Sequence, residues 1–255
     1  MQRKTAALRA LKAASAFLKT EFRVGHAGTK KADGTLVSAA DDGSEERILR
    51  VLKRSFPEDA ILSEECGSIE GNSGYRWILD PLDGTHNFLA GIPIFGILLA
   101  VEQKGIITMS IASFPMFDEV FFAEKGKGAF LNGKRIHVSR DSSLRGKMLL
   151  GDSNKDIELE AVMRDLAQAS KNDYRFRFLG EGPFGLTRVA LGTVPAAIVR
   201  SGKLWDLAGP ALLVTEAGGR VTDLQGNAWD RKARPLLATN GLVHDTVLPL
   251  LAEKS

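Results

Sequence analysis

Apolar residues near the N-terminus recur at the spacing of an α-helix. One face of residues 5–22 carries five of them, with lysines and arginines in between: Leu8, Leu11, Ala14, Phe17 and Leu18. This period predicts an amphipathic helix that packs one side against a core. Residues 25–35 are rich in glycine and lysine, which predicts a mobile loop. A second helix is expected over residues 41–56, because Pro57 ends its pattern.

Short apolar runs then replace the helical period. Residues 60–62 and 76–79 predict buried strands, and acidic residues follow each of them closely. Four longer strand-like runs come next, punctuated by glycine, proline and an Asn-Gly pair: 92–103, 106–114, 119–124 and 128–138. Turn signals between strand-like runs are typical of hairpins. This stretch of the chain therefore predicts an antiparallel meander.

The second half of the chain alternates strand-like and helical segments. The predicted strands are 148–150, 175–179, 196–199 and 219–223. The predicted helices are 156–170, 184–191, 206–216 and 243–251. Such alternation indicates an α/β layer, so the expected fold class is mixed, α+β in the first half and α/β in the second. Polar residues 139–147 mark a soft boundary between an N-terminal half, residues 1–143, and a C-terminal half, residues 144–255, of one compact unit.

Composition places the chain among ordinary globular enzymes. It has 255 residues, of which 44% are hydrophobic and 25% charged. A single cysteine, Cys66, excludes an intramolecular disulfide and fits a reducing compartment, so we expect a cytoplasmic protein. Residues 1–21 lack the apolar stretch of a signal peptide. The longest apolar run, 92–101, is shorter than the ~20 residues that cross a membrane.

The net charge of +3 and a pI near 9.0 raise the question of nucleic acid. The charges are interspersed and no run of five like charges occurs, which argues against nucleic acid as the main partner. A mild basic excess also attracts phosphorylated substrates.

Two carboxylates stand at the end of the predicted strand 76–79. Asp80 and Asp83 flank a proline that stiffens the backbone, and the carbonyl of Leu82 could add a third oxygen. Oxygen donors without a histidine or cysteine cluster favour Mg²⁺, Mn²⁺ or Ca²⁺ over Zn²⁺. The alternative for this segment is a solvated Asp-Gly turn.

The residues that follow could hold a phosphate. Gly84, Thr85 and His86 are predicted to open the next segment with free backbone N–H groups, which bind phosphate at helix starts. The Thr85 hydroxyl could orient a water molecule, or it could serve as a helix cap in the same geometry.

Four further acids are candidates for the same site. Glu64 and Glu65 follow the strand 60–62 and could complete a metal site or be loop acids. Asp206 is expected to begin a helix, because Pro210 is tolerated in a first turn. Asp41 also stands at a predicted helix start, and both aspartates could be N-caps instead.

Together these motifs resemble the inositol monophosphatase family, which belongs to the lithium-sensitive, Mg²⁺-dependent sugar phosphatase superfamily. The matching segments run in family order: residues 36–41 with Glu45, the acidic pair at 63–65, the central signature 80–88 and the C-terminal signature from 205–206 through 216–219. The resemblance implies a layered αβαβα sandwich, a small phosphate monoester as substrate, and a homodimer.

The resemblance also implies a role for each matched residue. Two or three Mg²⁺ ions are expected, with Mn²⁺ as a possible substitute. The first ion would be held by Glu64, Asp80 and the Leu82 carbonyl, and the second by Asp80, Asp83 and Asp206. Glu65 would support a weaker ion through water, while Asp41 and Thr85 would activate the attacking water.

Substrate contacts are implied in the same way. Backbone N–H groups of residues 84–86 would hold the phosphate beside Asp83 and Asp206. Arg200 lies near a segment that frames the substrate in the family, and it could meet a second phosphate.

Three positions depart from the family pattern. Ser38 replaces a threonine, and Glu181 stands where a small hydroxyl residue is more common. Residues 198–202 contain no acid, although the inositol-specific enzymes place one there to grip a ring hydroxyl. Inositol phosphate therefore shares the candidate list with fructose bisphosphate, histidinol phosphate and an adenosine bisphosphate. A non-catalytic regulator that binds protein or RNA is the alternative from another class, and loss of a metal carboxylate would favour it; none is lost.

Overall fold

Two N-terminal helices form as the apolar pattern predicts. The computed structural model describes residues 2–24, 29–30, 36–152, 164–165, 167–169, 171–180, 182–231 and 235–251. Helix α1 spans Gln2–Val24 and α2 spans Ala39–Ser55. Their buried faces share one core cluster, which includes Leu11, Leu18, Ile48 and Leu52. Between them, β1 (Thr29–Lys30) pairs with β2 (Leu36–Val37), and the rest of the predicted loop 25–35 lies outside the described residues.

An eight-stranded sheet carries the predicted meander. Its order is β10-β9-β8-β7-β6-β5-β3-β4, with β3 parallel to β5 and every other pair antiparallel. The strands are β3 (Ala60–Ser63), β4 (Gly67–Ile69), β5 (Tyr75–Asp83), β6 (Gly96–Gln103), β7 (Ile106–Phe114), β8 (Glu119–Glu124), β9 (Gly128–Leu131) and β10 (Lys134–Ile136). The sequence pattern did not predict β4, which is short and has no fully buried residue.

A five-stranded mixed sheet forms in the second half. Its order is β12-β11-β13-β15-β14, with β12, β11 and β13 parallel and β15 antiparallel to both its neighbours. The elements are β11 (Met148–Gly151), β12 (Arg175–Phe178), α5 (Gly182–Ala190), β13 (Ala196–Val199), α6 (Leu204–Glu216), β14 (Arg220–Asp223), β15 (Leu236–Thr239) and α7 (His244–Leu251). Strand β15 was not predicted, and most of the predicted helix 156–170 lies outside the described residues.

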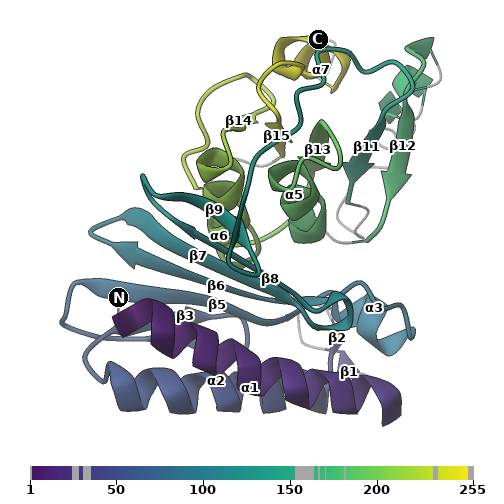
Figure 1. Ribbon diagram of the computed structural model, residues 1–255. Coiled ribbons are helices and arrows are strands. Elements are labelled where there is room, and N and C mark those ends of the chain that lie inside the picture. The colour runs from purple at the N-terminus through teal and green to yellow at the C-terminus, as the bar shows by residue number, and fades with distance from the viewer. Residues whose placement is uncertain are drawn as a thin grey trace.

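The layers follow the order αβαβα. Helices α1 and α2 cover one face of the eight-stranded sheet, α5 and α6 lie between the two sheets, and α7 lies beyond the second sheet (Figure 1). One core cluster joins Phe114 and Phe121 of the first sheet to Leu186 of α5 and Leu213 of α6. The mixed fold class is therefore confirmed. The division into halves 1–143 and 144–255 stays a prediction, and this shared core explains why the two would act as one unit.

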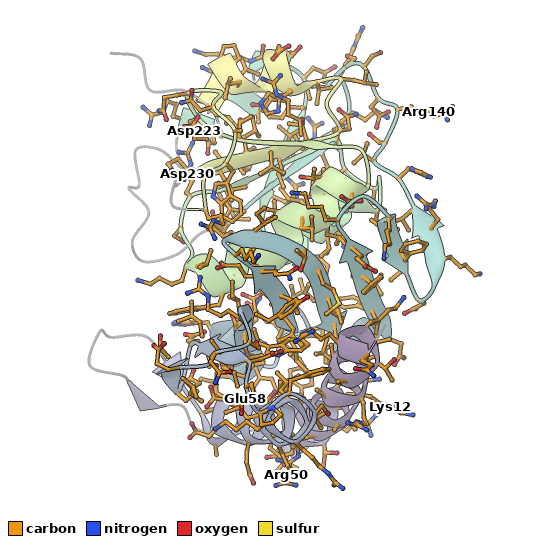
Figure 2. The ribbon with its side chains drawn as sticks, turned by 90° about the vertical axis from the view of Figure 1, so that its left-hand side faces the viewer. Lys12, Arg50, Glu58, Arg140, Asp223 and Asp230 are labelled. Carbon is orange, nitrogen blue, oxygen red and sulfur yellow. The ribbon has the colours of Figure 1, made fainter. Side chains whose placement is uncertain are left out.

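Charged side chains of both signs occupy the outer surface. In Figure 2, Lys12, Arg50 and Glu58 lie at the end formed by α1 and α2, and Arg140 and Asp230 lie toward the opposite end. Among the described helices, none combines the length and the apolar character that crossing a membrane requires.

Helix α6 corrects one expectation. The sequence pattern predicts Pro210 in a first turn, but α6 begins at Leu204, so the proline lies inside the helix. A proline in a helix interior removes one hydrogen bond and typically costs about 3 kcal/mol. Residues 207–211 are all buried between the sheets, and this packing keeps the segment helical despite the proline.

The second sheet buries a histidine that titrates far from its usual range. His244 is fully buried, with its ring nitrogens each 3.0 Å from a threonine hydroxyl, Nε2 from Thr222 and Nδ1 from Thr239. Burial lowers the pKa of His244 from 6.5 to about 4, with help from Arg220 and against the opposing effect of Asp245.

This shift predicts a pH-dependent loss of stability. The unfolded chain protonates His244 near pH 6.5 while the folded chain resists until about pH 4, so stability falls as the pH is lowered through that window. Between about pH 7 and pH 5 the loss should be about 1–2 kcal/mol. Urea unfolding of wild type and His244→Gln tests it: the free energy of unfolding of the variant should fall less steeply with pH. Parallel curves would contradict the assignment.

Candidate metal centre

Strand register brings the first two acids together. In the parallel pair of β3 and β5, Ser63 lies opposite Leu79. The next residues, Glu64 and Asp80, therefore leave the same edge of the sheet, and the Glu64 N–H still donates to the Leu79 carbonyl at 3.2 Å. The sequence thus places a carboxylate at the end of each of two neighbouring strands.

Helix α6 supplies the third acid. Asp206 lies in the first turn of α6, where its Oδ2 accepts a hydrogen bond of 2.5 Å from the backbone N–H of Lys203. One carboxylate oxygen each from Glu64, Asp80 and Asp206 can be chosen so that all three lie within 4.8 Å of one another. Residues far apart in the chain therefore form one acidic cluster.

The electrostatics of Asp80 show what this cluster lacks. Burial raises the pKa of Asp80 well above its usual range, and the negative charges of Glu64, Asp83 and Asp206 raise it further. A hydrogen bond from the Leu82 N–H acts in the opposite direction and is outweighed. Carboxylates this close repel one another unless a proton or a cation compensates. The donor set consists of hard oxygen ligands, so it fits Mg²⁺ or Mn²⁺.

Asp83 and Leu82 lie at the end of β5 beside this cluster. Both are buried, and the carboxylate of Asp83 acts electrostatically on Asp80. The carbonyl of Leu82 accepts a hydrogen bond of 3.1 Å from the Thr85 hydroxyl. Their predicted roles as metal ligands stay predictions, and their positions are compatible with them.

A threonine and a buried aspartate form a hydrogen-bonded pair. The Thr85 hydroxyl lies 2.9 Å from Oδ1 of Asp41, and it donates either to this oxygen or to the Leu82 carbonyl. The other oxygen of Asp41 accepts from the backbone N–H and the hydroxyl of Ser38, at 2.7 and 2.8 Å. Asp41 is therefore fixed by the start of α2, within a capping box whose N-cap is Ser38, and it also reaches Thr85.

The residues after Asp83 form a short helix, α3 (Thr85–Leu89). Gly84 precedes it with φ +89°, a left-handed conformation that favours glycine. The first N–H groups of a helix have no partner within it, so those of Thr85 and His86 are available in principle to an anion. The His86 side chain itself is exposed.

Glu65 lies in the turn between β3 and β4 and is half-buried. The same turn is anchored by Glu45 of α2, whose Oε1 accepts from the Ser63 hydroxyl at 2.5 Å and from the Cys66 N–H at 3.1 Å. The predicted role of Glu65 as support for a weaker ion is not tested by these contacts and stays a prediction.

Arg200 has a different partner from the one expected. Its guanidinium donates to both oxygens of Asp165, at 2.9 and 2.7 Å, and both side chains are buried. Arg188 is likewise paired, with Glu119. A contact of Arg200 with a substrate phosphate would require its buried ion pair to break, so the structure does not support that prediction.

Two polar residues that bond to segments next to the candidate ligands were not found from sequence. The Ser44 hydroxyl donates to the Pro81 carbonyl at 2.6 Å and so ties α2 to β5 between the two aspartates. Asp152, directly after β11, accepts from the backbone N–H groups of Arg200 and Ser201. Asp152 follows the predicted strand 148–150, and an acidic residue at the end of a strand was the signal that could have identified it.

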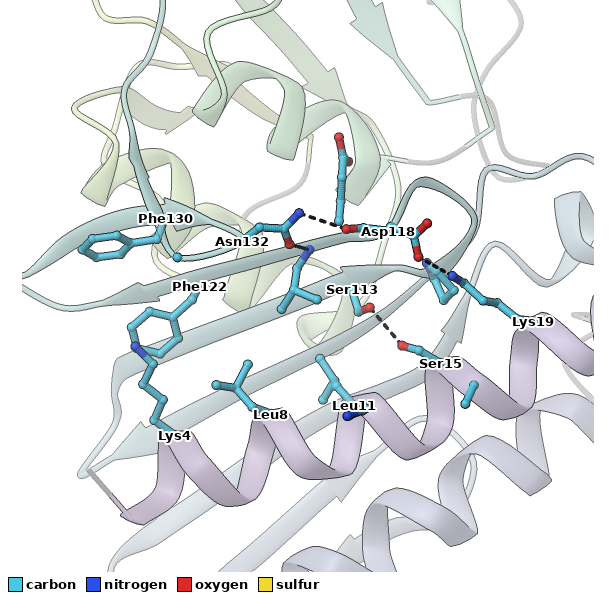
Figure 3. A pocket seen from close by; sticks show the side chains of 16 residues that line it. Lys4, Leu8, Leu11, Ser15, Lys19, Ser113, Asp118, Phe122, Phe130 and Asn132 are labelled. Atoms are coloured by element: carbon cyan, nitrogen blue, oxygen red, sulfur yellow. Dashed lines mark hydrogen bonds and ion pairs between the residues drawn. The ribbon is translucent and has the colours of Figure 1, made fainter.

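A groove of about 730 Å³ lies elsewhere, between α1 and strands β7 to β9 (Figure 3). Leu8, Leu11 and Phe122 give it an apolar lining, and the Lys4 ammonium lies 3.8 Å from the centre of the Phe122 ring. None of its lining residues belongs to the acidic cluster, so this groove is not the candidate metal centre.

Comparison with known proteins also indicates a metal-dependent phosphatase. The model of the inositol monophosphatase family matches residues 2–255. A fructose-1,6-bisphosphatase/inositol-1-monophosphatase of Thermotoga maritima is 31% identical over 231 residues, which cover 91% of this chain and 88% of the relative. The Nus factor SuhB of Pasteurella multocida is 36% identical over 204 residues, 78% of this chain and 75% of the relative.

Solved structures agree with the sequence relatives. The extragenic suppressor protein suhB of Bartonella henselae superposes with a TM-score of 0.95 at 29% identity, over 100% of both chains. An IMPase/NADP phosphatase complexed with Mg²⁺ and phosphate gives a TM-score of 0.80 at 25% identity, over 96% of this chain and 93% of that chain.

The fold and its acidic cluster define a metal-dependent phosphatase, a hydrolase of phosphoric monoesters. The chain belongs to the inositol monophosphatase family.

The Asp80→Asn variant distinguishes two effects on stability: the repulsion among the acids without metal, and the stabilisation by a bound cation. In EDTA, Asp80→Asn should unfold at the same temperature as wild type or higher, because the variant no longer has to bury a carboxylate beside three other acids or protonate it. In Mg²⁺, wild type should gain stability, about 2.7 kcal/mol at a concentration 100 times Kd, whereas the variant should gain little. Thermal unfolding with and without Mg²⁺ measures both effects.

Asp245→Asn is the matched control, because Asp245 is an exposed aspartate paired with Arg220 away from the cluster. It should keep the full response to Mg²⁺. An Asp80→Asn protein that responds to Mg²⁺ as wild type does would exclude Asp80 as a ligand.

Proposed function

We propose that this phosphatase hydrolyses a small phosphorylated alcohol, similar to inositol monophosphate, with Mg²⁺ as its cofactor and water as the nucleophile. The observation that carries the proposal is the acidic cluster of Glu64, Asp80 and Asp206 beside the hydrogen-bonded pair of Asp41 and Thr85. Phosphoryl transfer to water needs positioning and charge neutralisation and no protein nucleophile, which these residues can provide.

The carboxylates divide into two sets of metal ligands in this proposal. Glu64, Asp80 and the Leu82 carbonyl would hold one ion, and Asp80, Asp83 and Asp206 would hold a second. Glu65 would support a third, weaker ion through water, and Mn²⁺ could substitute for Mg²⁺. Bound divalent ions supply a nucleophilic water at neutral pH and neutralise the developing charge on phosphate.

Asp41 and Thr85 would take the proton from the attacking water. When the Thr85 hydroxyl donates to Asp41, its oxygen lone pairs face away from that bond and can accept a hydrogen bond from water. The water proton would pass to Thr85 Oγ1 while the Thr85 proton passes to Asp41 Oδ1. Ser38 holds the other oxygen of Asp41, which keeps the carboxylate oriented toward Thr85.

The start of α3 would hold the phosphate. Backbone N–H groups of Gly84, Thr85 and His86 are the proposed donors, and the left-handed backbone at Gly84 turns the chain there. Asp83 and Asp206 are proposed to lie beside the bound substrate as ligands of the same ion.

A panel of phosphate esters with Mg²⁺ tests the proposal. Inositol monophosphate, fructose bisphosphate, histidinol phosphate and adenosine 3′,5′-bisphosphate represent the candidates, and the Thermotoga maritima relative named for both of the first two favours them. Wild type should release phosphate from at least one. Asp83→Asn should lower that rate by about a thousandfold or more, because it removes a ligand charge with little change of volume.

Near-wild-type turnover by folded Asp83→Asn at saturating Mg²⁺ would refute the proposed ligand set. Wild type without phosphate release on any ester of the panel would instead favour a non-catalytic role. That alternative has support of its own, since some relatives carry the name Nus factor SuhB. The complete set of carboxylates argues for catalysis.

Lithium sensitivity belongs to the same proposal. Li⁺ is similar in size to Mg²⁺ but carries one charge, and it should compete for the weaker cation position near Asp83 and Asp206 after hydrolysis and so retard product release. Inhibition should be uncompetitive with substrate. Glu65→Gln should weaken it, because Glu65 is proposed to lie near this weakly bound ion. Steady-state kinetics at several Li⁺ concentrations decide the point, and full activity at high millimolar Li⁺ would exclude it.

Two properties complete the proposal. A cytoplasmic location is supported by the single cysteine, which cannot form an intramolecular disulfide. A homodimer is proposed from the family resemblance alone, and nucleic acid is not proposed as a substrate.

A further inference from the structure

Asp152 is a buried acid that the proposed reaction does not use. It follows β11 directly, and its own N–H continues the ladder to β13 by donating to the Ile198 carbonyl at 3.3 Å. Only 5% of Asp152 is exposed. Its carboxylate must therefore be satisfied by protein groups, and among the described residues its partners outside its own backbone belong to one short segment.

That segment, residues 200–203, connects β13 to α6. Oδ1 of Asp152 accepts from the Arg200 N–H at 2.7 Å, and Oδ2 accepts from the N–H and the hydroxyl of Ser201, both at 3.1 Å. The Arg200 side chain is fixed separately by its pair with Asp165, in which the two side chains are 7% and 0% exposed. The beginning of the segment is thus held through main chain and side chain together.

The end of the segment is bonded to the metal centre. Lys203 donates its N–H to Oδ2 of Asp206, and Gly202 precedes it with φ +136°. A Cβ on residue 202 would lie 3.1 Å from the same Oδ2, so the backbone here is in close contact with the carboxylate. A displacement of residues 200–203 would therefore move Asp206.

We propose that Asp152 is a positioning residue, which holds segment 200–203 in place and thereby orients Asp206 toward Glu64 and Asp80. The inference rests on the proposed function only in taking Asp206 as a Mg²⁺ ligand. Loss of a group that bonds directly to a metal ligand typically costs 10–100-fold in metal affinity. Asp152 acts on Asp206 through residues 200–203, so we expect an effect at or below the lower end of that range. A tight cluster of oxygen ligands from three elements depends on each element keeping its place.

Mg²⁺ binding measured by calorimetry on the intact chain tests the inference without any substrate. Asp152→Asn keeps the shape of the side chain but turns one acceptor into an N–H₂ group that faces backbone donors. It should raise the Kd of the Mg²⁺ ion proposed to bind Asp206 by about three- to tenfold. Ser201→Ala removes only one of the three hydrogen bonds and should give a smaller increase in the same direction.

Asp59→Asn is the matched control for a merely structural effect. Asp59 is also buried, and it accepts hydrogen bonds from Arg3, Ser73 and Trp77 at the opposite end of β3 from Glu64. This variant should unfold at a lower temperature than wild type but bind Mg²⁺ with a Kd within about twofold of it.

Unchanged Mg²⁺ affinity in folded Asp152→Asn would overturn the inference, and so would an equal loss in Asp59→Asn. If Asp152→Asn does not fold, the Ser201→Ala variant decides alone. Wild-type Mg²⁺ affinity in Ser201→Ala would then overturn the inference. A protein that binds Mg²⁺ but hydrolyses no ester of the panel would contradict the substrate proposal and leave this result intact, so the two failures are distinguishable.

Discussion

Mutual repulsion among closely spaced carboxylates is the constraint on which the site depends. Asp80 and Asp83 are buried and Glu64 and Asp206 are half-buried, and the charges of Glu64, Asp83 and Asp206 all raise the pKa of Asp80, which burial has already raised. Charges taken out of water are tolerated only when they are paired or bound to metal. Without bound cations, this arrangement of carboxylates destabilises the folded chain. Bound cations would remove the repulsion, and a metal-dependent hydrolase uses such cations for its reaction.

The layered architecture holds these charges in place. Parallel pairing of β3 with β5 fixes Glu64 beside Asp80, and α6 packs between the two sheets to deliver Asp206 from the second half of the chain. The start of α2 contributes Asp41 from the opposite face of the same sheet, and Ser44 ties that helix to Pro81. The candidate metal centre thus lies where an outer helix, a sheet and an inner helix meet, and each candidate ligand is held by an element with a buried face or follows one directly.

Much of this arrangement could be predicted from sequence, because the signals are local. Strands β7, β8 and β13 have the predicted bounds, since each is a short run of mostly apolar residues with turn residues or charges at its ends. The candidate ligands follow from acids directly after apolar runs. Strand β4 was not predicted, because none of its three residues is fully buried, and β15 was not predicted although all four of its residues are buried. The partner of Arg200 could not be predicted, because Asp165 is 35 residues away in the chain and only the fold brings the two together.

Anomalous diffraction from crystals grown with Mn²⁺ tests the central claim most directly, because it locates the ion without reference to any substrate. We predict two neighbouring peaks that share Asp80: one about 2 Å from carboxylate oxygens of Glu64 and Asp80, and one about 2 Å from oxygens of Asp80, Asp83 and Asp206. A cluster without Mn²⁺ at a saturating concentration, or Mn²⁺ bound only at other acids of the chain, would contradict it.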